Sequence, residues 1–355
     1  MKKGIGTLVI TLLVATMLFA FAGCGTPIVE TPADSPSAES ANVDTKPAEE
    51  SNDQPTGDYS NQEYVMVTFL TNFPLYVDHD IKAFNAWGEK MGVKHSVVGP
   101  ADANAEAAVS ALEQVIASKP AGLLVNGIDD SLIPAINSAV EAGINVVLYD
   151  GDIPNSNRTG HIGSNWYNIG VEQGKAMAEL LNGEGKVAYM GIVGSPNMEL
   201  GFQGLLDTLA GYPGIEVVGK YDDKASIEEA ASITTNILTA FPDIDGICGF
   251  DAMSGPGIGT AIKEAGKAGQ IKVTTVDWQP EHLNLVKEGV IDVLVGQKRE
   301  LFTSIGAQWL FDAYNSTVQL TSNDQGAGLS VIPNDCDAGI IIINKDNVDT
   351  IIENY

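Results

Sequence analysis

The chain has 355 residues with 46 acidic against 19 basic side chains, a formal net charge of −27. This charge argues against nucleic acid and anionic lipid as partners, because their phosphates require a basic surface. The length is enough for one large domain or two domains of ordinary size.

The N-terminal segment combines basic, apolar and small residues ahead of a cysteine. Lys2 and Lys3 precede an apolar run over residues 8–22, and Gly23 comes directly before Cys24. This order is typical of a bacterial lipoprotein signal; the alternative is a membrane anchor with an incidental cysteine. The run is shorter than the ~20 residues of a spanning helix. We therefore expect a signal peptide over 1–23 and a lipid on Cys24, which would hold the protein at the cell membrane, outside the cytoplasm.

The next stretch differs in composition from the rest of the chain. Residues 25–62 are rich in Ser, Pro, Glu, Asp, Ala and Thr, with Tyr59 as the one aromatic residue. Such a segment buries too little apolar surface to offset its ordering entropy. We expect residues 24–61, with the lipidated cysteine at their start, to form a disordered linker.

From residue 64 on, short apolar runs alternate with helical patterns. The first half predicts strands over 64–69, 93–98, 122–126 and 144–150, with helices near 78–91, 103–118 and 133–142. The second half predicts strands near 185–190, 215–221, 246–248, 271–276 and 290–295, with helices near 167–181, 200–210, 227–240, 257–265 and 280–288. This alternation indicates an α/β fold with parallel sheets. Such sheets bind ligands beyond the carboxyl ends of their strands.

Motifs for catalysis, phosphate binding or metal binding are absent from the sequence. Residues 255–259 read as a tight helix start, and Pro154 disfavours a calcium loop at residues 150–152. Cys248 and Cys336 are expected to be buried, unpaired thiols, although a disulfide stays open. We therefore expect no enzyme activity, no cofactor and no metal.

Seven short stretches carry a resemblance to a known family. The chain resembles the periplasmic-type sugar-binding proteins of ABC importers, the ribose and galactose receptor group of type 1 substrate-binding proteins. The resemblance covers nearly all of residues 64–355. The stretches that carry it are residues 73–76, 148–150, 161–165, 238–245, 250–253, 276–277 and 296–297.

The resemblance implies a two-lobed fold, each lobe a parallel sheet flanked by helices, joined by three crossover segments. The N-terminal lobe would comprise residues 62–165 and 299–326, and the C-terminal lobe residues 166–298 and 327–355. The crossovers would serve as hinges near Ser164, Gln297 and Gly326.

The resemblance also implies a set of ligand-binding residues. Carboxylates of Asp150 and Asp277 would accept hydroxyl hydrogen bonds, and Gln297 could both donate and accept. Aromatic rings would face a sugar ring, and Asp251 would either bind ligand or cap the following helix. The aromatic candidates are Phe73, Tyr76, Phe250 and Trp278; core or surface packing is their alternative role.

The sequence departs from the ribose receptors in ways that leave the ligand open. Gly151 stands where an arginine is expected, residues 196–199 lack another, and an aromatic residue near Ala225 is missing. Hexoses, pentoses, inositol-like polyols and furanosyl signal molecules all remain candidates.

The function implied is capture of a sugar or polyol and delivery to an ABC permease with its ATPase subunit, by a monomeric protein. One alternative is a lipoprotein that presents a sugar or furanosyl signal to a sensor kinase or chemoreceptor. The others are a nucleoside-binding receptor and, less favoured, an extracytoplasmic hydrolase.

Overall fold

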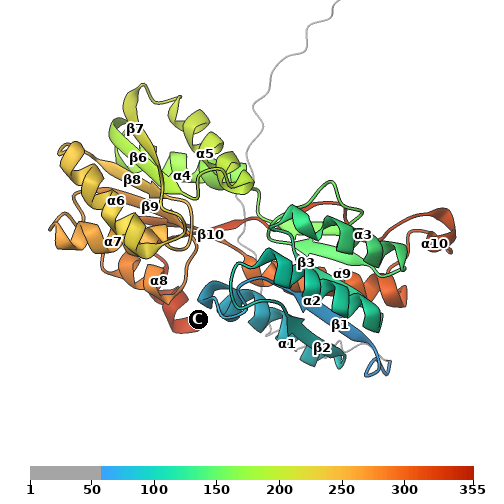
Figure 1. Cartoon of the computed structure of the whole chain (residues 1–355). Coiled ribbons are helices and arrows are strands. Elements are labelled where there is room, and N and C mark those ends of the chain that lie inside the picture. Colours follow the sequence, from blue (N-terminus) through green and yellow to red (C-terminus); the bar gives the residue numbers. More distant parts are fainter. Residues whose placement is uncertain (1–56) are drawn as a thin grey trace, which may run out of the picture. The chain divides into compact units, whose positions relative to one another are not determined.

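A computed structural model describes residues 57–355, which contain two six-stranded sheets (Figure 1). The first sheet has the order β11-β5-β4-β3-β1-β2, with every pair parallel. We call this sheet and its helices the N-terminal lobe. Its strands are β1 (Glu63–Val67), β2 (Lys94–Val98), β3 (Gly122–Asn126), β4 (Val146–Tyr149), β5 (Gly160–Gly163) and β11 (Cys336–Asp337).

The first sheet is buried on both faces, as its nearly continuous apolar strands predict. In β1, Tyr64 and Met66 face one hydrophobic cluster while Val65 and Val67 face another. The first cluster is completed by α1 (Lys82–Met91) and α9 (Arg299–Asn315), and the second by α2 (Ala105–Ser118) and α3 (Ile133–Glu141).

The second sheet repeats this arrangement in what we call the C-terminal lobe. Its order is β12-β10-β9-β8-β6-β7, and only the edge strand β12 runs antiparallel to its neighbour. Its strands are β6 (Glu184–Gly191), β7 (Gly214–Asp222), β8 (Gly246–Gly249), β9 (Lys272–Val276), β10 (Val293–Gln297) and β12 (Ile340–Asn344).

Helices also cover both faces of the second sheet. Val187 and Tyr189 of β6 pack with α4 (Trp166–Leu180) and α5 (Pro196–Leu209). On the opposite face, Ala188 and Met190 belong to the cluster that includes α6 (Ile227–Ala240), α7 (Ser254–Glu264) and α8 (Pro280–Lys287). The predicted α/β fold with two parallel-dominated sheets is therefore confirmed.

The helix predicted over residues 78–91 begins with a different geometry. A π-helical turn, η1 (Tyr76–Ile81), leads directly into α1, and its buried residues are Tyr76, His79 and Asp80. Turns of this kind are rare and are often found at functional sites. The remaining short helices are η2 (Asp130–Leu132), α10 (Asp324–Ala327) and α11 (Val348–Asn354).

The third crossover lies further along the chain than the expected position at Gly326. Strand β11 pairs with β5 in the first sheet, so the chain changes sheet at Ala338 and Gly339. The placement of residues 327–337 in the C-terminal lobe was therefore wrong. Buried Ile332 packs in the N-terminal lobe, and Asp335 accepts a hydrogen bond from His161 at 2.7 Å.

Three further findings concern residues 57–355. No helix there is both long and apolar enough to cross a bilayer. No group of three or more His, Cys, Asp or Glu side chains there could hold a metal ion. Cys248 and Cys336 are free thiols in different sheets; Cys248 is buried and Cys336 is half-buried. Cys24 and the expected signal and linker lie outside the described residues.

Candidate ligand-binding site

Asp150 and Asp277 occupy equivalent places in the two lobes. Asp150 directly follows β4 and Asp277 directly follows β9, each the third strand in the order of its sheet. Both have positive backbone φ angles, +68° and +69°, which are uncommon for residues other than glycine. Strained backbone of this kind is concentrated at functional sites. The carboxyl ends of parallel strands are also where such sheets bind ligands.

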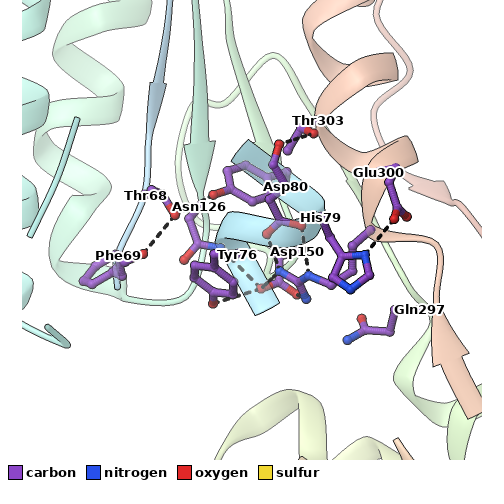
Figure 2. Close-up of polar contacts among 12 residues, drawn as sticks. Thr68, Phe69, Tyr76, His79, Asp80, Asn126, Asp150, Gln297, Glu300 and Thr303 are labelled. Carbon is purple, nitrogen blue, oxygen red and sulfur yellow. Dashed lines mark hydrogen bonds and ion pairs between the residues drawn. The ribbon is translucent and has the colours of Figure 1, made fainter. Parts of the chain in front are cut away.

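The Asp150 carboxylate is the centre of a hydrogen-bonded network (Figure 2). It accepts bonds from the Tyr76 hydroxyl and the Asn126 amide nitrogen, both at 3.3 Å. It also accepts from Nη1 and Nη2 of Arg299, at 3.2 and 3.1 Å. Asn126 is the last residue of β3, paired in register with Tyr149 of β4, so the sheet itself brings the amide beside the carboxylate.

Arg299 bridges two carboxylates inside the protein. Its Nε and Nη2 donate to Asp80 at 2.9 and 2.6 Å, while its other bonds reach Asp150. The guanidinium carbon also lies 4.9 Å from the centre of the Tyr76 ring, a cation–π contact. Burial raises the pKa of Asp80 to about 7, and the charge of Arg299 opposes this rise. Burial by itself would lower the pKa of Arg299, but the negative charges of Asp150 and Asp80 outweigh this effect and raise it.

Asp277 and Gln297 form the corresponding pair in the C-terminal lobe. Gln297 ends β10, and its Nε2 donates to Oδ1 of Asp277 at 3.1 Å. Both residues are buried. Burial raises the pKa of Asp277, and the charge of Arg299 partly opposes that rise.

Two amide oxygens next to these carboxylates lack a hydrogen-bond partner among residues 57–355. They are Oδ1 of Asn126 and Oε1 of Gln297, both buried. Buried polar atoms are nearly always paired in folded proteins, so an unpaired acceptor calls for a donor from outside the chain. Each lobe thus presents a carboxylate beside an unpaired amide oxygen at the carboxyl ends of its strands, and the C-terminal lobe adds the buried, unpaired Oδ2 of Asp251 and Oε1 of Gln279.

Tyr76 and Phe73 lie together beside this site. The Tyr76 ring contacts the Phe73 ring edge-on, with centroids 5.7 Å apart. With Leu75, both rings belong to a hydrophobic cluster that includes Ala252 and Met253 of the C-terminal lobe. Tyr76 therefore bonds to Asp150 by its hydroxyl and belongs to a cluster that residues of both lobes form.

Trp278 packs beside Gln297 and His79. Its indole nitrogen donates to the Gln297 carbonyl oxygen at 2.9 Å, and its ring lies 4.8 Å from the His79 ring. It also lines a cavity of about 460 Å³ with Lys82, Tyr355 and other residues. The indole is thus bonded to the backbone of Gln297, and sugar stacking by Trp278 remains a prediction.

Phe250 and Asp251 lie directly after β8. Phe250 is fully buried and packs edge-on against Phe202, with centroids 4.9 Å apart. Oδ1 of Asp251 accepts from the backbone nitrogens of Met253 and Ser254, at 2.8 and 3.0 Å, at the start of α7. Phe250 thus packs in the core, and Oδ1 of Asp251 caps α7. Oδ2 of Asp251 is buried without a hydrogen-bond partner among residues 57–355, so a ligand contact of Asp251 remains a prediction.

Three residues of the network were missed in the sequence: Asp80, Asn126 and Arg299. Asn126 could have been found, because it ends a predicted strand next to the one that Asp150 follows. Arg299 supplies the guanidinium whose absence at Gly151 we noted, and it comes from a segment 149 positions further along the chain. The sequence contains no spacing that links Arg299 to Asp80 or Asp150.

Two α/β lobes with buried carboxylates and amide oxygens at their strand ends define a two-lobed ligand-binding protein. The chain matches the model of the periplasmic binding protein domain over residues 64–315. Its fold is similar to a sugar-binding protein of a sugar ABC transporter from Bacillus halodurans, with a TM-score of 0.76 and 30% identity. It is also similar to AraP, an arabinose-binding protein from Geobacillus stearothermophilus, with a TM-score of 0.74 and 32% identity. Each comparison covers 82% of this chain and 99% of the other.

A further relative is the xylitol-binding protein of Mycolicibacterium smegmatis, 28% identical over 231 residues. That match covers 63% of this chain and 61% of the relative's length. The chain belongs to the periplasmic binding protein family, in the type 1 sugar-binding group. It is a solute-binding protein of the ABC-transporter type and not an enzyme.

Proposed function

We propose that the chain captures a neutral five-carbon sugar or sugar alcohol between the carboxyl ends of its two sheets and delivers it to an ABC permease. The observation that carries this proposal is the pair of buried, unpaired oxygens, Asn126 Oδ1 and Gln297 Oε1. Each lies beside a carboxylate, since the amide nitrogens of the same side chains bond to Asp150 and Asp277. A ligand with several adjacent hydroxyls would supply the donors that these acceptors need.

The charges of the site favour a neutral ligand. The site contains three carboxylates, Asp80, Asp150 and Asp277, and Arg299 is the guanidinium that bonds to Asp80 and Asp150. Arg299 is already engaged with two of them, so a sugar acid or sugar phosphate would bring additional negative charge without a free cationic partner in this network. A neutral polyol avoids this repulsion.

The relatives support the size of the ligand. One solved structure 32% identical to this chain is an arabinose-binding protein, and a curated relative is a xylitol-binding protein. Arabinose and xylitol share a five-carbon chain that carries several hydroxyls. The phenol ring of Tyr76, next to Asp150, would pack against the carbon–hydrogen face of such a ligand.

Closure of the two lobes on the ligand would couple binding to transport. Ligand contacts from both lobes favour a closed form only if they are stronger there than in the open form. The crossovers at Ser164, Lys298 and Ala338–Gly339 are the segments that would absorb the hinge rotation. The closed form would then dock on the permease, which the ATPase subunit powers.

The proposal includes a lipid on Cys24. It is supported by the basic, apolar and small residues that precede this cysteine, and by a family that works outside the cytoplasm. Anchoring would raise the effective concentration of the receptor near its permease. Cells grown with labelled palmitate should label the parent protein but not Cys24→Ala; equal labelling of both would contradict the anchor.

A binding panel tests the proposed function. L-arabinose, D-xylose and xylitol should stabilise the protein, by about 4 °C for a ligand at 100 times its Kd. Isothermal titration would then give the affinity of each. Hexoses, galacturonate and adenosine serve as comparison ligands. Binding of a hexose, adenosine or galacturonate in preference to every neutral five-carbon compound, or binding of none of the panel, would contradict the proposal.

A further inference from the structure

The second crossover, at Lys298, lies between one residue bonded to the carboxylate of the C-terminal lobe and one bonded to the carboxylate of the N-terminal lobe. Gln297 binds Asp277 of the C-terminal lobe, and Arg299 binds Asp150 of the N-terminal lobe. Arg299 is also the first residue of α9, which packs along the first sheet. Arg299 is therefore fixed to the N-terminal lobe at the point where the chain leaves the hinge.

The hydrogen bonds of Arg299 leave its side chain almost no freedom. A guanidinium carries five N–H groups, and the four bonds to Asp80 and Asp150 use four of them. The side chain is 2% exposed and that of Asp80 is 0% exposed. Nη2 is shared between Asp80 and Asp150, so the position of one carboxylate is tied to that of the other.

The π-helical turn η1 places Asp80 where it can hold this arginine. Tyr76 and Asp80 are four positions apart in η1; Tyr76 bonds to Asp150, and Asp80 bonds to Arg299. The backbone of Asp80 is held in turn, because its carbonyl oxygen accepts from the Thr303 hydroxyl of α9 at 2.8 Å. Figure 2 shows Asp80 between Thr303 and Asp150.

The geometry points to Asp80 and Arg299 as positioning residues that orient the Asp150 carboxylate toward the ligand, a role that rests on the proposed function. Asp80 is completely buried and acts through Arg299, while Arg299 fixes both oxygens of Asp150. The planar fork of arginine permits this bidentate contact; a lysine would place a single point charge there.

The test is isothermal titration of arabinose and xylitol into four variants. Asp80→Asn and Arg299→Lys should bind at least about tenfold more weakly than the parent, because each loses the bidentate geometry. Arg299→Lys keeps the positive charge. Weak binding by this variant would therefore show that the bidentate orientation of Asp150 matters, and not the charge at position 299 alone. The matched control is Asp292→Asn, which disrupts a half-buried pair with Lys272 in the C-terminal lobe and should bind within twofold of the parent.

Melting temperatures separate positioning from stability. A residue with a purely structural role would lower the melting temperature yet leave the affinity of the folded protein unchanged. The fourth variant, Asp80→Leu with Arg299→Met, removes the fully buried carboxylate together with its guanidinium and leaves Asp150 with its bonds from Tyr76 and Asn126. It should fold and still bind at least about tenfold more weakly, and it decides the outcome if either single variant is unfolded.

The outcomes separate this inference from the proposed function. Folded variants that bind within twofold of the parent would overturn the positioning role and leave the proposed function intact. A parent protein that binds no sugar or polyol of the panel would overturn both. Selective weakening in the Asp80 and Arg299 variants, with Asp292→Asn unchanged, would support the positioning role.

Discussion

Replacing Asp150 by alanine is expected to weaken binding of the preferred five-carbon ligand at least about 100-fold, or roughly 3 kcal/mol. The substitution removes a carboxylate that would accept hydroxyl hydrogen bonds, and charged hydrogen bonds are the stronger kind. The fold should persist because Arg299 keeps its two bonds to Asp80. Isothermal titration measures the loss, and Asp277→Ala should reduce the affinity in the same way.

Asp152 provides a matched control two positions away. Its carboxylate accepts from Arg158 Nη2 at 2.7 Å and is exposed outside the network around Asp150. Asp152→Ala should therefore bind ligand within twofold of the parent. Unchanged affinity in both Asp150→Ala and Asp277→Ala would show that the ligand binds elsewhere.

Replacing Gly170 by alanine is expected to destabilise the protein by about 3 kcal/mol. Gly170 of α4 faces α5, where a Cβ would overlap the Gly201 carbonyl oxygen and lie 2.8 Å from the Leu205 nitrogen. Those neighbours are backbone atoms, so the two helices would have to move apart. Alanine normally favours a helix by about 1 kcal/mol over glycine, so a loss here would identify close helix packing as the cause.

Urea unfolding measures this effect, with Gly211→Ala as the control. Gly211 is exposed, and a Cβ there would lie no closer than 3.3 Å to its nearest neighbour, the Thr208 carbonyl oxygen. Its replacement should change the free energy of unfolding by less than about 0.5 kcal/mol. Equal stability of Gly170→Ala and the parent would contradict the close contact of α4 and α5.

The sheets could be predicted from the sequence because their strands are buried on both faces. The run that forms β4 is continuous in apolar residues, and Asp150 marks the point at which burial ends. The same reasoning predicted Asp277 after β9. These two aspartates remain predicted ligand residues, now with Asn126 and Gln297 beside them.

The arginine and the last crossover could not be predicted, because both depend on distant contacts. Arg299 bonds to Asp80, which lies 219 positions earlier in the chain. The hydrophobic periodicity of a sequence does not predict contacts between residues so far apart. Strand β11 has only two residues, Cys336 and Asp337, too few for a hydrophobic pattern. Its place beside β5 follows from tertiary contacts such as that between His161 and Asp335.

A crystal structure of the protein with bound arabinose tests the central claim most directly. We expect sugar hydroxyls within hydrogen-bond distance of Asp150 and Asp277, and new donors at Asn126 Oδ1 and Gln297 Oε1. A sugar bound elsewhere, with these two amide oxygens still unpaired, would contradict the proposed site.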